Sequence, residues 1–200
     1  LKITTKNGKK TVKYSGDNVA MAEFMNKFED FSPARNWDME QKQKKKDTIS
    51  FADAFKKLDA DHEVLTKMVG KIKDADDQKT CSKSLLMKYL MNKIALQKDY
   101  VKAHKLNAKT DPKLKALMGE IQPNDSDYAS YGLVTSLVEY NLPKNESDYK
   151  DVTEYGIDYL NSIDKTVSEK KQKAAMLEGF VGRVIDADGM DVEKFWTRAI

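Results

Sequence analysis

The chain has 200 residues, of which 40% are hydrophobic and 34% are charged, and this suits one compact domain or a domain with an appendage. Basic residues number 35 and acidic residues 32, and the net charge of +3 is too balanced for a protein that binds nucleic acid through its overall charge. No apolar run approaches the roughly 20 residues that a bilayer-spanning helix needs, so we expect no membrane insertion by this segment.

The first residues predict a β-hairpin. Residues 1–6 and 9–14 flank Asn7-Gly8, the dipeptide that best tolerates the positive φ angles of a type I′ turn. A two-residue loop fixes the register and places Ile3 opposite Val12 on an apolar face. Because a lone two-stranded ribbon is marginally stable in water, we expect residues 1–16 to be the edge of a neighbouring β-domain.

Apolar residues at three- and four-residue steps predict helices through most of residues 17–200. Start and stop signals mark their ends, among them Ser50, Thr110-Asp111-Pro112 and Pro143. Residues 34–48 fit either a charged helix or a loop, and residues 74–77 are predicted to be a loop. The expected helices cover about residues 19–31, 50–72, 82–106, 111–122, 125–141, 148–163, 168–186 and 191–200.

The first and last helices carry specific expectations. The last helix has Val192, Phe195 and Trp196 on one side and then stops without a glycine, proline or cap. We interpret this unfinished apolar stripe as a second sign, beside the hairpin, that the chain is a piece of something larger. In the first helix the inward positions are expected to be Met21, Phe24, Met25, Phe28 and Phe31.

Together these elements predict a mainly α fold, either an antiparallel helical bundle or a short irregular α-solenoid of about six to eight helices, with an N-terminal β-hairpin. We expect two parts, the hairpin at residues 1–16 and a helical domain at residues 17–200 that is truncated at its C-terminal end. The side chains expected to contact partners are Leu1, Ile3, Val12, Tyr14, Trp37, Phe195 and Trp196.

His62 is the one residue that suggests a metal site. It shares a helix face with Asp59, and a histidine and a carboxylate are two of the three or four ligands that such a site needs. The remaining ligands are not visible in the sequence, and His62 is also in line with Leu58 and Leu65. We therefore favour a core-edge histidine paired with Asp59. His104 lies near a helix C-terminus, which favours a capping role.

Cys81 is the only cysteine, which excludes an internal disulfide, a CxxC redox pair and a thiolate metal cage. It lies near a predicted helix start with Lys79 and Lys83 close by, a setting found around reactive thiols. An incidental or partly buried thiol is nevertheless the favoured interpretation. We assign no catalytic, cofactor-binding or metal-ligating residue and expect no cofactor.

Two further clusters have ordinary interpretations. The basic run from Lys42 to Lys46 lacks the interleaved aromatic residues of an RNA-binding segment, so a solvated segment is favoured. A set of tyrosines in two successive helices is able to line a ligand groove, although tyrosines in a helical body more often bridge core and water. These tyrosines are Tyr128, Tyr131, Tyr140, Tyr149, Tyr155 and Tyr159.

The segment KKTVKYSGDN at residues 9–18, followed by MAEFMNK at residues 21–27, resembles a junction in bacterial envelope proteins of the TlpA/ResA-like thiol-disulfide type. In that family a small β-domain ends in a strand with a "tv.ysGdN" ending, a helical segment beginning "EFMNKF" follows, and a thioredoxin-fold domain closes the chain. The resemblance covers about the first 30 residues. It implies a periplasmic or cell-envelope location and places the redox motif WCxxC in a C-terminal domain, so no catalytic residue is carried over to this chain.

The leading hypothesis is a non-catalytic helical interaction or spacer domain of an extracytoplasmic thioredoxin-like thiol-disulfide protein. Its partners would be the flanking β-domain and thioredoxin-fold domain of the same polypeptide and a protein client. One alternative is a stand-alone helical binding module with a tyrosine-lined groove. The other is a metal-dependent hydrolase that uses His62 and neighbouring carboxylates.

Overall fold

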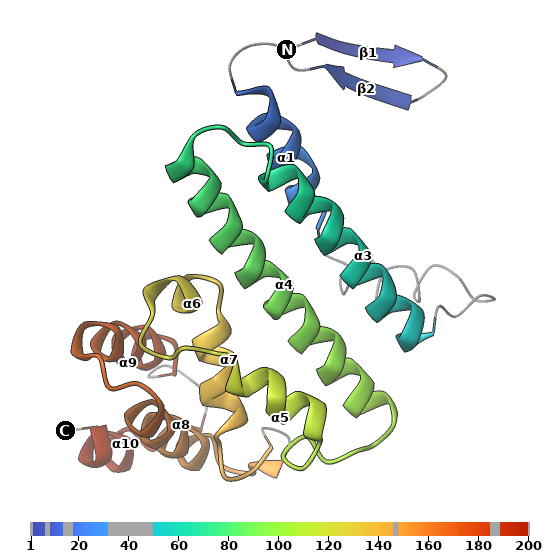
Figure 1. Ribbon diagram of the computed structural model, residues 1–200. Helices are drawn as coiled ribbons and strands as arrows, with labels where there is room; N and C mark the ends of the chain where they lie inside the picture. Colours follow the sequence, from blue (N-terminus) through green and yellow to red (C-terminus); the bar gives the residue numbers. More distant parts are fainter. Residues whose placement is uncertain are drawn as a thin grey trace. The chain divides into compact units, whose positions relative to one another are not determined.

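A computed structural model describes residues 2–6, 9–13, 18–31, 50–145, 148–184 and 189–199 (Figure 1). The side chains of the two strands and of residues 183, 184, 198 and 199 lie outside this description. The chain divides into two compact units, residues 1–104 and residues 105–200. The described part holds nine helices and one pair of strands, so the predicted mainly helical class is confirmed. The uncertain segment 34–48 lies outside the described residues.

Unit 1 begins with a short antiparallel ribbon. Strands β1 (Lys2–Lys6) and β2 (Lys9–Lys13) pair with Ile3 opposite Val12 and Lys2 opposite Lys13. The connecting residues and the side chains that would form the apolar face lie outside the described residues. The hairpin as an edge of a neighbouring β-domain, and the domain boundary after residue 16, therefore stay predictions.

The described residues of unit 1 also form three helices, α1 (Val19–Glu29), α3 (Phe51–Val69) and α4 (Ala75–Ala103). Helix α3 starts where the sequence predicts, because the Ser50 side chain accepts a hydrogen bond from the backbone N–H of Asp53 at 3.1 Å. The predicted loop at residues 74–77 is wrong. The Asp74 carboxylate accepts from the N–H groups of Asp76 and Asp77, so it caps α4, which begins at Ala75.

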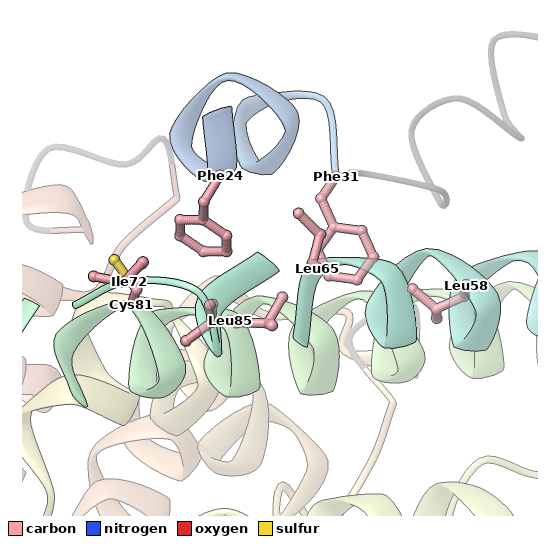
Figure 2. Packing of buried hydrophobic residues seen from close by; sticks show 8 residues of the cluster. Phe24, Phe31, Leu58, Leu65, Ile72, Cys81 and Leu85 are labelled. Carbon is pink, nitrogen blue, oxygen red and sulfur yellow. The ribbon is translucent and has the colours of Figure 1, made fainter. Parts of the chain in front are cut away.

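The helices α3 and α4 pair side by side along an antiparallel hairpin, and α1 packs on α3 (Figure 1). Figure 2 shows Phe24 and Phe31 directed from the α1 segment toward this hairpin, and both side chains are buried. The prediction for Met25 is wrong, because its side chain is 41% exposed. The buried side chains of the hairpin that Phe24 and Phe31 pack against, which we call the α1 seat, are Leu58, Leu65, Val69, Ile72, Cys81 and Leu85.

The part of unit 2 that the structure describes forms six helices. They are α5 (Pro112–Gly119), α6 (Ser126–Ser130), α7 (Leu133–Tyr140), α8 (Val152–Thr166), α9 (Lys170–Val184) and α10 (Val192–Ala199). The Asp111-Pro112 start of α5 is confirmed, since the Asp111 carboxylate accepts from the N–H of Leu114 at 2.6 Å.

The predicted continuous helix at residues 125–141 is wrong. Gly132 has a φ of +71° and ends one helix before the next begins, so the segment forms α6 and α7. This break accounts for the ninth helix. A residue in this left-handed backbone region cannot continue a right-handed helix.

The core of unit 2 gathers side chains from α7, α8, α9 and α10. Helix α10 approaches α8 closely: a Cβ atom at Gly156 would lie 3.0 Å from Cε2 of Phe195. The start of α10 is tied to α8 as well, because the Asp191 N–H donates to Oγ1 of Thr153 at 2.8 Å. The buried members of this core are Val138, Leu142, Tyr159, Leu160, Ile163, Phe180 and Phe195.

Replacing Gly132 with alanine tests the α6–α7 break. We expect Gly132→Ala to lower the free energy of unfolding of unit 2 by about 1 kcal/mol, because an L-residue is strained at this φ. The measurement is urea denaturation followed by circular dichroism. The matched control is Gly119→Ala, where a Cβ atom meets nothing within 4 Å and no positive φ is required. Equal midpoints for the two variants would show that the break imposes no strain.

Candidate functional site

Four polar side chains meet on the α3–α4 hairpin of unit 1, and we call them the His62 cluster: Asp59, His62, Tyr89 and Lys93. The imidazole of His62 stacks on the Tyr89 ring, with centroids 3.9 Å apart and planes 16° apart. The Tyr89 hydroxyl donates to Oδ1 of Asp59 at 2.5 Å. The Lys93 ammonium lies 4.9 Å from the centroid of the same ring, at a distance where a cation is attracted to the aromatic face.

The helix period brings these groups together in pairs. Asp59 and His62 are three residues apart on α3, and Tyr89 and Lys93 are four apart on α4, so each pair shares one helix face. Packing of the two helices then sets the pairs opposite each other. The predicted pairing of His62 with Asp59 is indirect. The Asp59 carboxylate accepts a hydrogen bond from Tyr89, and the His62 imidazole stacks on the Tyr89 ring.

Burial lowers the pKa of His62 below its usual value, and Lys93 lowers it further, whereas Asp59 opposes both effects. At neutral pH the imidazole is therefore uncharged. Its ring nitrogens make no hydrogen bond to another residue in the described part of the chain, so it can take up a proton. Over the same described ranges, no group of three or more His, Cys, Asp and Glu side chains is placed to hold a metal ion.

Cys81 lies in the α1 seat and is buried. Burial raises the pKa of its thiol, and the neighbouring carboxylate of Asp77 raises it further. Cys81 is more deeply buried than the favoured interpretation of a partly buried thiol predicts, because it is only 3% exposed. His104 caps α4 as predicted: its ring Nδ1 lies 2.9 Å from the Tyr100 carbonyl oxygen, and its ring stacks on that of Tyr100.

The predicted partner contacts have different outcomes. Phe195 is fully buried in the core of unit 2, so its use as an exposed contact is wrong, and the stripe on α10 needs no missing neighbour at this position. Trp196 remains 36% exposed on α10, next to Val192 at 43%. Five contacts stay predictions, because these residues or their side chains lie outside the described part: Leu1, Ile3, Val12, Tyr14 and Trp37.

The tyrosines of unit 2 mostly pack on one another and on the core. Tyr159 stacks on Phe180 with centroids 4.1 Å apart, and Tyr155 contacts the rings of Tyr149, Tyr159 and Phe180. The Tyr149 hydroxyl donates to Asp158 at 3.0 Å, and burial together with this carboxylate raises the pKa of Tyr149 to about 12. This arrangement supports the interpretation of these tyrosines as core-bridging residues.

Sequence analysis missed Tyr89 and Lys93 as partners of His62. Their four-residue spacing was a visible signal that they share a face of α4. The contact itself depends on the register between α3 and α4, which the sequence pattern does not fix. Val192, Phe195 and Trp196 were predicted to form one apolar stripe, and the structure divides it, because Phe195 is buried whereas Val192 and Trp196 are exposed.

No protein-family model matches this chain, and no curated protein or solved structure matches it either. Within the ranges that the structure describes, none of the helices combines the length and apolar character needed to cross a bilayer.

The lowered pKa of His62 predicts a pH dependence of stability. The unfolded chain takes up a proton near pH 6.5, before the folded chain does, so the stability of unit 1 is complete above that pH and falls as the pH decreases toward the folded pKa. We expect the His62→Phe variant, which keeps a ring against Tyr89, to lose less stability than the wild type between about pH 7 and pH 5. If the urea midpoints of the two proteins change in parallel over this pH range, the lowered pKa of His62 would be contradicted.

Proposed function

We propose that this chain is a non-catalytic helical interaction domain that docks a neighbouring protein surface through α10. The observation that carries the proposal is the exposed apolar pair Val192 and Trp196, four residues apart on one face of that helix. Tryptophan is among the residues most enriched at the energetic centres of protein interfaces. Beside this pair on α10, Phe195 and its contact with Gly156 hold the helix to the body of unit 2.

The neighbouring surface, in this proposal, belongs to a thiol-disulfide protein of the bacterial envelope. The support is the resemblance of residues 9–27 to the TlpA/ResA-like junction. The redox chemistry then resides in a thioredoxin-fold domain with WCxxC, and the helical chain acts as a spacer or a client-presenting element between that domain and a β-domain. The location is periplasmic or at the cell envelope.

The chemistry of Cys81 is consistent with redox chemistry that resides in another domain. A thiol attacks a disulfide as the thiolate, and both burial and Asp77 disfavour that form in Cys81. The proposal therefore assigns no thiol exchange to the folded chain itself. A stand-alone binding module with a tyrosine-lined groove is less well supported, because Tyr155 and Tyr159 are engaged in ring contacts within unit 2. A hydrolase at His62 would need metal ligands beyond Asp59.

The gene that encodes the chain offers the first test. The proposal predicts an open reading frame that continues into a thioredoxin-fold domain carrying WCxxC. Sequencing across the flanking DNA decides this, and a frame without that domain would contradict the assignment to the TlpA/ResA-like type.

The docking surface has its own test. We expect Trp196→Ala to weaken binding of the chain to the separately expressed thioredoxin-fold domain by roughly thirtyfold, since truncation of an interface tryptophan commonly costs about 2 kcal/mol or more. Isothermal titration calorimetry measures the dissociation constant. The control is Val64→Ala, another exposed apolar side chain, on α3 of unit 1. Equal affinities for the wild type and Trp196→Ala would exclude α10 as the docking surface.

A further inference from the structure

Helix α1 is held on the α3–α4 hairpin mainly by aromatic side chains. Phe24 and Phe31 are buried in the α1 seat, and Phe28 is partly buried against it while its ring lies 5.2 Å from that of Phe24. Figure 2 shows Phe24 above the end of the seat that holds Ile72 and Cys81. The helix itself has only 11 residues, which is short for a helix stable without such contacts.

Cavities lie at both ends of the contact between α1 and α3. One, of about 280 Å³, lies between the start of α1 (Asn18 to Met21) and residues 71–74 after α3. The other, of about 320 Å³, lies between Lys27, Asp30 and Phe31 at the end of α1 and residues 57–65 of α3. Both cavities open to the surface, so among the described residues the α1 side chains that line them make fewer packing contacts than the buried Phe24 does.

Polar contacts from Lys88 and Asn92 of α4, which we call the latch, hold the C-terminal end of the α1 segment. The Lys88 ammonium donates to the carbonyl oxygen of Phe28 at 2.5 Å and to that of Glu29 at 3.3 Å, and it lies 4.4 Å from the Phe28 ring centroid. Asn92 donates to the Phe31 carbonyl oxygen at 3.1 Å. At the other end, the Asn18 side chain makes no capping hydrogen bond. Both latch residues belong to α4, so the latch is lost when α1 leaves.

The hairpin under α1 has supports of its own. Ser50 and Asp74 cap the two helices. Where α3 begins and α4 ends, the rings of Phe51 and Tyr100 are in contact, with centroids 5.3 Å apart. A short helix that lines an open pocket at each end, packed on two longer capped helices, is expected to open at lower free energy than they do.

We infer that α1 is a strap that opens while α3 and α4 stay paired, and that Cys81 is shielded when the strap is closed and reacts when it is open. Opening would uncover Leu65, Ile72 and Leu85 of the α1 seat together with the Cys81 thiol. The fold thereby makes chemical modification of this thiol conditional on the release of α1. This inference does not depend on the proposed function.

The test is the urea dependence of Cys81 labelling in the full chain. Ellman's reagent, an aromatic disulfide, reacts with the thiolate and releases one thionitrobenzoate per Cys81, which is followed by its absorbance. Opening of α1 alone exposes little surface, so we expect a labelling rate that hardly changes at low urea and rises steeply only near the unfolding transition. A rate that follows the slope of global unfolding at every urea concentration would overturn the inference.

Two variants separate the strap from the hairpin. Lys88→Met removes the Lys88 contacts of the latch, which are absent in both the open and the unfolded chain, so it should raise the labelling rate at low and at high urea by the same factor of roughly three to ten. Phe51→Ala removes an aromatic contact between α3 and α4, so it should raise the labelling rate at high urea while leaving the rate at low urea within about twofold. An equal rise at low urea in Phe51→Ala would show that α1 and the hairpin open together, and would overturn the inference even if Lys88→Met does not fold.

Discussion

The apolar seam between α3 and α4 is the contact on which unit 1 depends. Leu58 and Leu65 of α3 and Leu85 of α4 are buried there, and each of the remaining features of the unit is placed by this pairing. The seam provides the surface that receives α1. It also sets the register that brings Asp59 and His62 opposite Tyr89 and Lys93. Without this pairing, neither the α1 seat nor the His62 cluster would exist.

Polar side chains mainly fix helix ends and helix contacts in both units. Asp74 and Asp111 begin helices, Lys88 holds the carbonyl end of α1, and Ser162 donates to the Val138 carbonyl oxygen at 2.7 Å inside unit 2. Such groups satisfy backbone atoms that would otherwise be buried without partners. His62, Cys81 and Tyr149 have altered pKa values that they owe first to burial. At these three residues an altered pKa therefore marks a packed position as much as a chemically active one.

The local signals in the sequence predicted much of the helical fold, and the errors have both local and long-range causes. Ser50 and Asp111-Pro112 mark helix starts because their side chains or ring act within one turn of backbone. The aspartates at 74–77 seemed to form a loop, but Asp74 is a cap and the next two begin α4. Gly132 breaks a strongly apolar stretch because of its φ angle, a property that composition does not reveal. Whether Phe195 or Val192 faced the core depended on the close approach of α10 to Gly156, which no pattern along one helix can supply.

The same limit applies to the candidate sites. Spacing within α3 and within α4 placed each pair of the His62 cluster on one face, but contact between the pairs needed the register of two packed helices. The most direct test of the account is native-state hydrogen exchange across α3 and α4, followed residue by residue by NMR. If the seam is the framework of unit 1, the amides of Leu58 and Leu65 in α3 and of Leu85 and Leu90 in α4 will exchange with one common free energy of opening. Distinct opening free energies for the two helices would contradict it.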